Sequence, residues 1–99
     1  MDAAIKYRIK TDSLFARFAA MKLGSRQVAF VLGSTIHLYN TSEEEFLQNT
    51  CWLKHELCHI AQFRRYGFFT FIFLYLYESV KQGYRNNKYE IEAREAEDK

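Results

Sequence analysis

The chain has 99 residues, a length that suits one domain with a single core over residues 1–99. Hydrophobic residues make up 48% of it and aromatic residues 17%, which excludes an intrinsically disordered chain. The net charge of +2 is too small to indicate a nucleic-acid partner, and none is expected.

The sequence shows neither a secretory signal nor a membrane-spanning segment. Residues 1–10 lack the apolar core of a signal peptide, so a cytoplasmic setting is expected. The longest apolar run, residues 68–77, is ten residues long, whereas a membrane span needs about 20. Cys51 and Cys58 are expected to be reduced thiols, because their spacing along one helix separates the α-carbons by roughly 10 Å, beyond disulfide reach.

The first part of the chain predicts a strand and then a helix. Residues 4–10 alternate apolar and basic side chains, which is the period of a half-buried strand. Asp12 can cap a helix that Gly24 ends. The apolar positions that recur at helical spacing in it are Leu14, Phe15, Phe18, Ala19 and Leu23.

Two β-rich runs, residues 27–32 and 35–40, come next in the chain. Gly33-Ser34 joins them, and glycine tolerates the positive φ that a type II′ turn demands. The two runs are therefore predicted to form a β-hairpin.

Three helices are predicted for the rest of the chain. Ser42 and Glu45 form a capping box at the start of the first, which should run to Tyr66. A second helix spans residues 68–82, and a third begins near Tyr89. The expected fold class is α+β: a strand, a helix and a hairpin form a small sheet with antiparallel strands, and three helices follow.

The first of these helices carries the run His55-Glu56-Leu57-Cys58-His59. Residues four apart lie on one face of a helix, so both imidazoles can bind one metal ion, for which Zn²⁺ is the candidate. Glu56 lies beside the first histidine, where it can take a proton from a metal-bound water. The alternative is a polar surface pair of histidines with a solvated glutamate.

A catalytic zinc needs a third protein ligand. Glu90 and Glu92 are the candidates, and only one of them can serve, because two residues along a helix are about 200° apart. Glu90 also has a structural explanation, as part of a capping box with Asn87 and an ion pair with Arg94. His37, on the second hairpin strand, could reach the site or be an ordinary outward strand residue.

The His-Glu-x-x-His run, followed by Glu90-x-x-Ala93 on a later helix, resembles the gluzincin metallopeptidases, in particular the single-domain minigluzincins. The resemblance implies a minimal zincin-like domain in which His55, His59 and Glu90 hold zinc. It also implies peptide-bond hydrolysis by a zinc-activated water, with Glu56 as the general base.

The chain departs from the family pattern at one position. An Asp that orients a zinc-bound histidine follows the Ala in that family, whereas this chain has Arg94 there. The resemblance further implies that substrate binds as an extra strand, and residues 35–40 are the candidate edge. Side chains that could stabilise the oxyanion are Tyr75, Tyr77, Tyr84 and Arg85.

Two main functions are compatible with these features. One is a zinc metalloendopeptidase, active or latent, acting on a peptide or protein substrate. The other is a non-catalytic, zinc-stabilised domain for interaction or oligomerisation; a regulatory protease that clips a repressor partner is a third. The run Phe68–Tyr77 is either packed against the site helix and the sheet, or exposed for membrane-surface contact or self-association.

Overall fold

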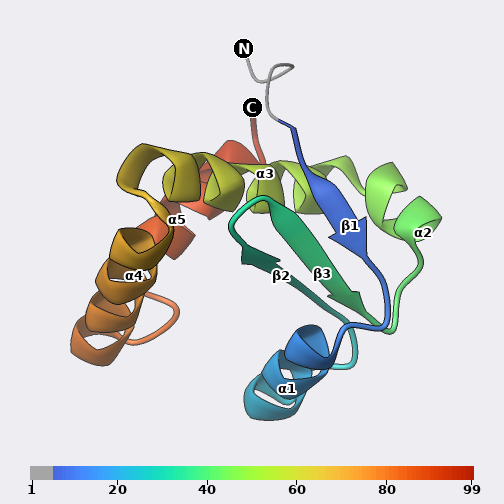
Figure 1. Cartoon of the computed structure of the whole chain (residues 1–99), viewed down its shortest axis with the longest axis horizontal. Coiled ribbons are helices and arrows are strands. Elements are labelled where there is room, and N and C mark those ends of the chain that lie inside the picture. Colours follow the sequence, from blue (N-terminus) through green and yellow to red (C-terminus); the bar gives the residue numbers. More distant parts are fainter. Residues whose placement is uncertain (1–5) are drawn as a thin grey trace.

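The computed structural model describes residues 6–99, which form three strands and five helices (Figure 1). In chain order they are β1 (Arg8–Lys10), α1 (Leu14–Leu23), β2 (Val28–Leu32), β3 (Thr35–Tyr39), α2 (Glu43–Gln48), α3 (Thr50–Tyr66), α4 (Phe68–Gln82) and α5 (Lys88–Ala96). The α+β class is confirmed. The predicted first strand is shorter than expected, beginning at Arg8, and residues 4 and 5 lie outside the described residues.

The three strands form one mixed sheet in the order β1-β3-β2. β1 pairs with β3 in parallel, and β2 pairs with β3 antiparallel through the predicted hairpin, whose Gly33 has a φ of 64°. Because β3 is the central strand, the prediction that residues 35–40 form a free edge is wrong. Among residues 6–99, the strands with an unpaired side are β1 and β2.

Helices cover both faces of the sheet, with α3 on one face and α1 on the other (Figure 1). The larger core lies on the α3 side. Its buried side chains come from the sheet and from four helices: Val31, Ile36, Leu38, Phe46, Ile60, Phe63, Phe71 and Tyr89. This core fixes α3, the helix with the His-Glu-x-x-His run, against the sheet.

The predicted helix from Ser42 to Tyr66 is two helices in the structure. Its capping box is present, with the Ser42 side chain accepting from Glu45 N, but the helix ends at Asn49. There the backbone leaves the helical region, at φ −89° and ψ 89°, and Asn49 Oδ1 accepts from Trp52 N at 3.1 Å. An Asn side chain that caps a new helix competes with helix continuation, which explains the break.

Helix α1 begins one residue later than predicted. Ser13, and not Asp12, is its N-cap, because the Ser13 Oγ accepts from Ala16 N at 3.4 Å. Asp12 occupies the preceding turn with a φ of 51°. Gly24 ends the helix in the left-handed conformation, as expected.

Helix α1 packs on the sheet through small side chains instead of large ones. Ala16 and Ala20, 0% and 3% exposed, are buried with Val28. The larger apolar side chains that the periodicity selected are exposed, with Phe18 at 67%. Of the apolar stripe expected to face the core, Ala19 packs beside these alanines and Phe15 contacts the His37 ring, whereas Leu14, Phe18 and Leu23 are exposed.

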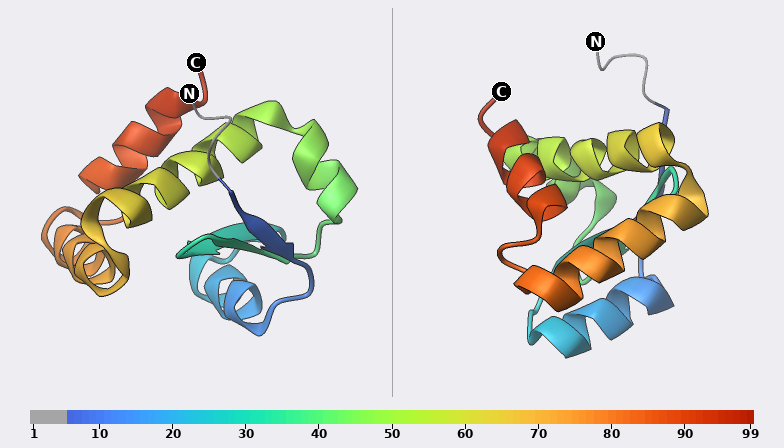
Figure 2. Two further views of the ribbon diagram at one scale, coloured as in Figure 1. Left: turned by 45° about the horizontal axis from the view of Figure 1, so that its top comes forward. Right: turned by 90° about the vertical axis from the view of Figure 1, so that its left-hand side faces the viewer.

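Helix α4 lies between two glycines of positive φ, Gly67 and Gly83. Phe71 is its buried residue and packs against aromatic rings of α3 and α5, whereas Phe69 and Phe73 are 81% and 68% exposed. One side of α4 is thus packed and the other is exposed (Figure 2). Within residues 6–99, no helix has both the length and the apolar character required to cross a bilayer.

The packing of α1 predicts opposite effects for two substitutions. Ala16→Leu should destabilise the protein by about 1–3 kcal/mol, because the larger side chain overpacks the contact with β2. Phe18→Ser should change the free energy of unfolding by no more than about 0.5 kcal/mol, because the ring is exposed. Urea unfolding measures both, and a larger loss for Phe18→Ser would contradict this arrangement.

Candidate metal centre

Two helices from distant parts of the chain bring the candidate ligands together. α3 carries His55, Glu56 and His59, and α5 carries Glu90. The buried Asn87 begins α5, since its Oδ1 accepts from Tyr89 N at 2.8 Å. Its Nδ2 donates to Ser79 Oγ and to Tyr75 O of α4, so the start of α5 is fixed against its neighbour.

The carboxylate of Glu90 lies between the two histidines. Its Oε1 is 3.1 Å from His55 Nε2, and its Oε2 is 3.2 Å from His59 Nε2. The potential ligand atoms of the three residues all lie within 4.8 Å of one another. Glu90 forms neither the predicted capping box with Asn87 nor the predicted ion pair with Arg94. The Arg94 guanidinium instead donates to the Arg85 carbonyl oxygen at 2.6 Å.

The other nitrogen of each imidazole is also held. Glu97 Oε2 is 2.7 Å from His55 Nδ1, and Gln62 Oε1 is 2.8 Å from His59 Nδ1. Both Nε2 atoms are thereby directed to the same point. Fixing the ring orientation of two histidines in this way is the role that outer hydrogen-bond partners have around metal ions.

Glu97 is the residue whose carboxylate contacts His55 Nδ1 and fixes the orientation of that ring. It follows Glu90 by two helical turns, so both carboxylates lie on the same side of α5. The sequence analysis missed this residue, and also Gln62. The spacing of Glu97 from Glu90 is the signal that could have pointed to it.

Glu92 is not beside the histidines. Its Oε1 accepts from Gln62 Nε2 at 2.7 Å, and Gln62 Nε2 also donates to the Tyr89 carbonyl at 3.1 Å. The structure thus separates the two candidates. Glu90 faces the Nε2 atoms of the histidines, whereas Glu92 is hydrogen-bonded to Gln62, the residue that contacts His59 Nδ1.

Glu56 lines a cavity and is buried, with 5% of the residue exposed. Burial raises the pKa of its carboxyl to about 7, although the charges of His59 and His55 oppose this shift. A carboxyl with a pKa near neutrality can both accept and release a proton, as a general base must.

The titration of the cluster follows from the Glu90 contacts. Burial disfavours a charged His55 ring, but hydrogen bonds to Glu90 and Glu97 and the charge of Glu56 outweigh it and raise its pKa to about 9. Burial likewise disfavours the charged Glu90, but its bonds to His55 and His59 hold its pKa well below the usual range. A metal ion must therefore displace protons from the imidazoles when it binds.

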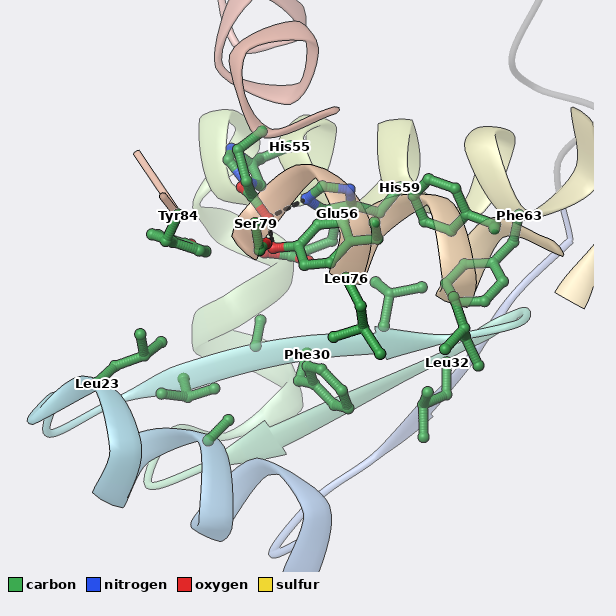
Figure 3. Close-up of a pocket in the computed structure, with 18 of the residues that line it drawn as sticks. Leu23, Phe30, Leu32, His55, Glu56, His59, Phe63, Leu76, Ser79 and Tyr84 are labelled. Atoms are coloured by element: carbon green, nitrogen blue, oxygen red, sulfur yellow. Dashed lines mark hydrogen bonds and ion pairs between the residues drawn. The ribbon is translucent and has the colours of Figure 1, made fainter. Parts of the chain in front are cut away.

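A cavity of about 640 Å³ leads to these residues (Figure 3). Side chains of β2 and α1 form one wall, and side chains of α4 form another. All of Val28–Leu32 line it, although alternate strand residues point to opposite faces. The cavity therefore runs along the unpaired side of β2, and its walls are mainly apolar.

His37 lies on the face of the sheet that α1 covers, away from the cluster. Its ring is 7% exposed and contacts Phe15, and its Nδ1 is 2.8 Å from Ser13 Oγ. Burial is the main reason why the pKa of the His37 imidazole is lowered, and the positive charge of the nearby Lys10 adds to this effect. His37 is not a ligand candidate in this structure, and it holds the start of α1 against β3.

Of the four side chains predicted to stabilise an oxyanion, two line the cavity and two do not. The Tyr75 hydroxyl donates to Glu90 Oε2, and Tyr84 lines the cavity, where burial raises its pKa to about 12. Tyr77 and Arg85 are exposed and do not line the cavity. Of the two tyrosines that line the cavity, Tyr84 is the one without a carboxylate partner in the described contacts.

Comparisons of the chain with models of known protein families, with curated proteins and with solved structures found no match. The geometry of the site is therefore the basis for a functional proposal.

The contacts of Glu97 predict a defined loss of metal affinity. Glu97→Ala should weaken Zn²⁺ binding about 10–100-fold, because His55 loses the partner that orients it. Glu95→Ala is the matched control, since Glu95 is exposed on the same helix. Competition with a chromophoric chelator measures both affinities, and equal affinities would show that Glu97 does not position His55.

Proposed function

We propose that the chain is a zinc-dependent peptidase with a minimal zincin-like fold. One observation carries the proposal: two histidine Nε2 atoms and the Glu90 carboxylate converge beside the buried Glu56, in the lining of an apolar cavity. Two nitrogens and one oxygen from His, His and Glu are a donor set typical of catalytic zinc. The resemblance to gluzincins supports the same assignment.

His55, His59 and Glu90 would hold the ion. When bound, zinc supplies a Lewis acid that polarises the substrate carbonyl and lowers the pKa of a bound water to about 7. Glu97 and Gln62 keep the imidazoles aligned, and the Tyr75 hydroxyl keeps the Glu90 carboxylate aligned. These contacts preorganise the ligands, so binding requires little rearrangement.

Glu56 is the general base of the proposed reaction. It accepts the proton of the attacking water at its carboxylate and passes that proton to the leaving amine. Tyr84 is the candidate donor to the developing oxyanion, since its side chain faces the same cavity.

The unpaired side of β2 is the proposed substrate site. A peptide in extended conformation could add to this strand, with backbone hydrogen bonds for affinity and the apolar walls for its side chains. β2, and not β3, takes this role because β3 is paired on both sides. His55, Glu56 and His59 line the same cavity as β2, so a bound peptide would reach the proposed zinc ligands.

A non-catalytic, zinc-stabilised domain is the second candidate, and one observation favours it. The histidines belong to α3 and Glu90 to α5, so a bound ion would cross-link two helices of a small fold. Under this alternative, chelation lowers the melting temperature and no peptide is cleaved.

Glu56→Gln distinguishes the two candidates. The variant should bind zinc with the stoichiometry of the wild type, because Glu56 is not a ligand, and it should lower kcat about 10²–10⁴-fold. Mass spectrometry of a peptide library measures cleavage, and Glu95→Gln is the matched control. Equal cleavage by Glu56→Gln and wild type would contradict the mechanism, and a wild type that binds zinc but cuts nothing would favour the second candidate.

The same variant also tests the substrate site. An uncleaved peptide bound to zinc-loaded Glu56→Gln should slow amide hydrogen exchange in β2, through new backbone hydrogen bonds. β1 is an internal control, because it is the other outer strand and lies away from the cavity. Equal protection of both strands, or of neither, would argue against strand addition on β2.

A further inference from the structure

Helix α1 presents large apolar side chains to solvent. Leu14, Phe18 and Met21, the α1 face, are 67%, 67% and 70% exposed. They recur at helical spacing, so they form one stripe on the side of the helix away from the buried alanines. A stripe of this kind on a surface helix marks an interaction site.

Helix α4 carries a second stripe of the same character. Phe69, Phe73, Tyr77 and Val80, the α4 face, are 81%, 68%, 57% and 88% exposed. Their spacing places them on one side of the helix, next to the side that lines the cavity with Ile72 and Leu76. The apolar surface of α4 is thus continuous from the cavity to the exposed stripe.

The two faces flank the same cavity. Leu23 of α1 and Leu76 of α4 both line it and are 53% and 58% exposed, so each helix extends the apolar wall outward (Figure 3). Both helices lie at the end of the molecule opposite the C-terminus in every view (Figures 1 and 2). The α1 face and the α4 face are therefore exposed on the two helices that border the cavity.

Basic side chains lie on the two helices that carry the α1 face and the α4 face. α1 contains Arg17 and Lys22, both exposed, and no acidic residue. On α4, the Lys81 ammonium lies 5.8 Å from the centre of the Tyr77 ring, whereas the Glu78 carboxylate turns away to accept from Lys88 N. Acidic side chains concentrate instead on α2 and α5.

We propose that the α1 face and the α4 face dock together on an anionic lipid bilayer. The aromatic and aliphatic side chains would enter the boundary of the headgroups and acyl chains, and Arg17, Lys22 and Lys81 would neutralise lipid phosphates. A second copy of the chain fits this surface less well, because two opposed α1 faces bring like charges together. Docking in this way turns the cavity mouth toward the membrane surface.

Sedimentation with lipid vesicles tests the docking. The full chain should bind vesicles of phosphatidylcholine that contain phosphatidylglycerol, bind phosphatidylcholine alone far less, and lose binding as salt rises. Three double variants should each lower the partition coefficient about tenfold or more. They are Phe18→Ser with Met21→Ser, Phe69→Ser with Phe73→Ser, and Arg17→Gln with Lys22→Gln.

Matched controls separate the surface from general effects of apolarity and charge. Ile91→Ser removes an exposed apolar side chain of α5, and Lys54→Gln with Lys99→Gln removes two exposed charges elsewhere. Both should bind vesicles as the wild type does, and circular dichroism should show that every variant is folded. Loss of binding in the controls, or none in the three double variants, would overturn the proposal.

Two further results would also overturn it. One is a wild type that does not bind the anionic vesicles, or binds both compositions equally. The other is a dimer in light scattering that the Phe18 and Phe69 variants dissociate, which would assign the surface to a second copy. The docking does not depend on the proposed hydrolysis, so Glu56→Gln should bind vesicles unchanged, and either proposal can fail alone.

Discussion

The Glu90 carboxylate is the group on which the rest of the site depends. It is 4% exposed, and a buried charge of this kind is tolerated only when hydrogen-bond partners compensate it. Those partners are His55 and His59 of α3 and Tyr75 of α4, so one side chain of α5 joins three helices. The same contacts direct the two Nε2 atoms to one point, which makes the arrangement suitable for a metal ion.

The small size of the domain explains why this site adjoins so much exposed apolar surface. The core on the α3 side fixes the site helix, but α1 packs through alanines and α4 through Phe71. Several large apolar side chains of these two helices, among them Phe18, Met21, Phe69 and Phe73, stay exposed near a cavity that runs along β2. A fold of this length buries a modest fraction of its surface, and the proposed functions use what is left exposed.

Local sequence patterns predicted the elements well and their packing poorly. The Gly33 turn and the glycines that end helices follow from backbone sterics, so they were predictable. The break at Asn49 and the burial of Ala16 depend on contacts that periodicity does not contain. Glu90 was predictable from a motif, whereas Glu97 acquires its contact with His55 only when α5 packs on α3.

The zinc content of three purified proteins tests the central role of Glu90 most directly. Inductively coupled plasma mass spectrometry should find about one zinc ion per chain in the wild type, since the cluster offers one set of ligands. Glu90→Ala should lose the metal, and Glu92→Ala should retain it, because Glu92 contacts Gln62 and not the histidines. Retention of zinc by Glu90→Ala at the level of the wild type would contradict the account.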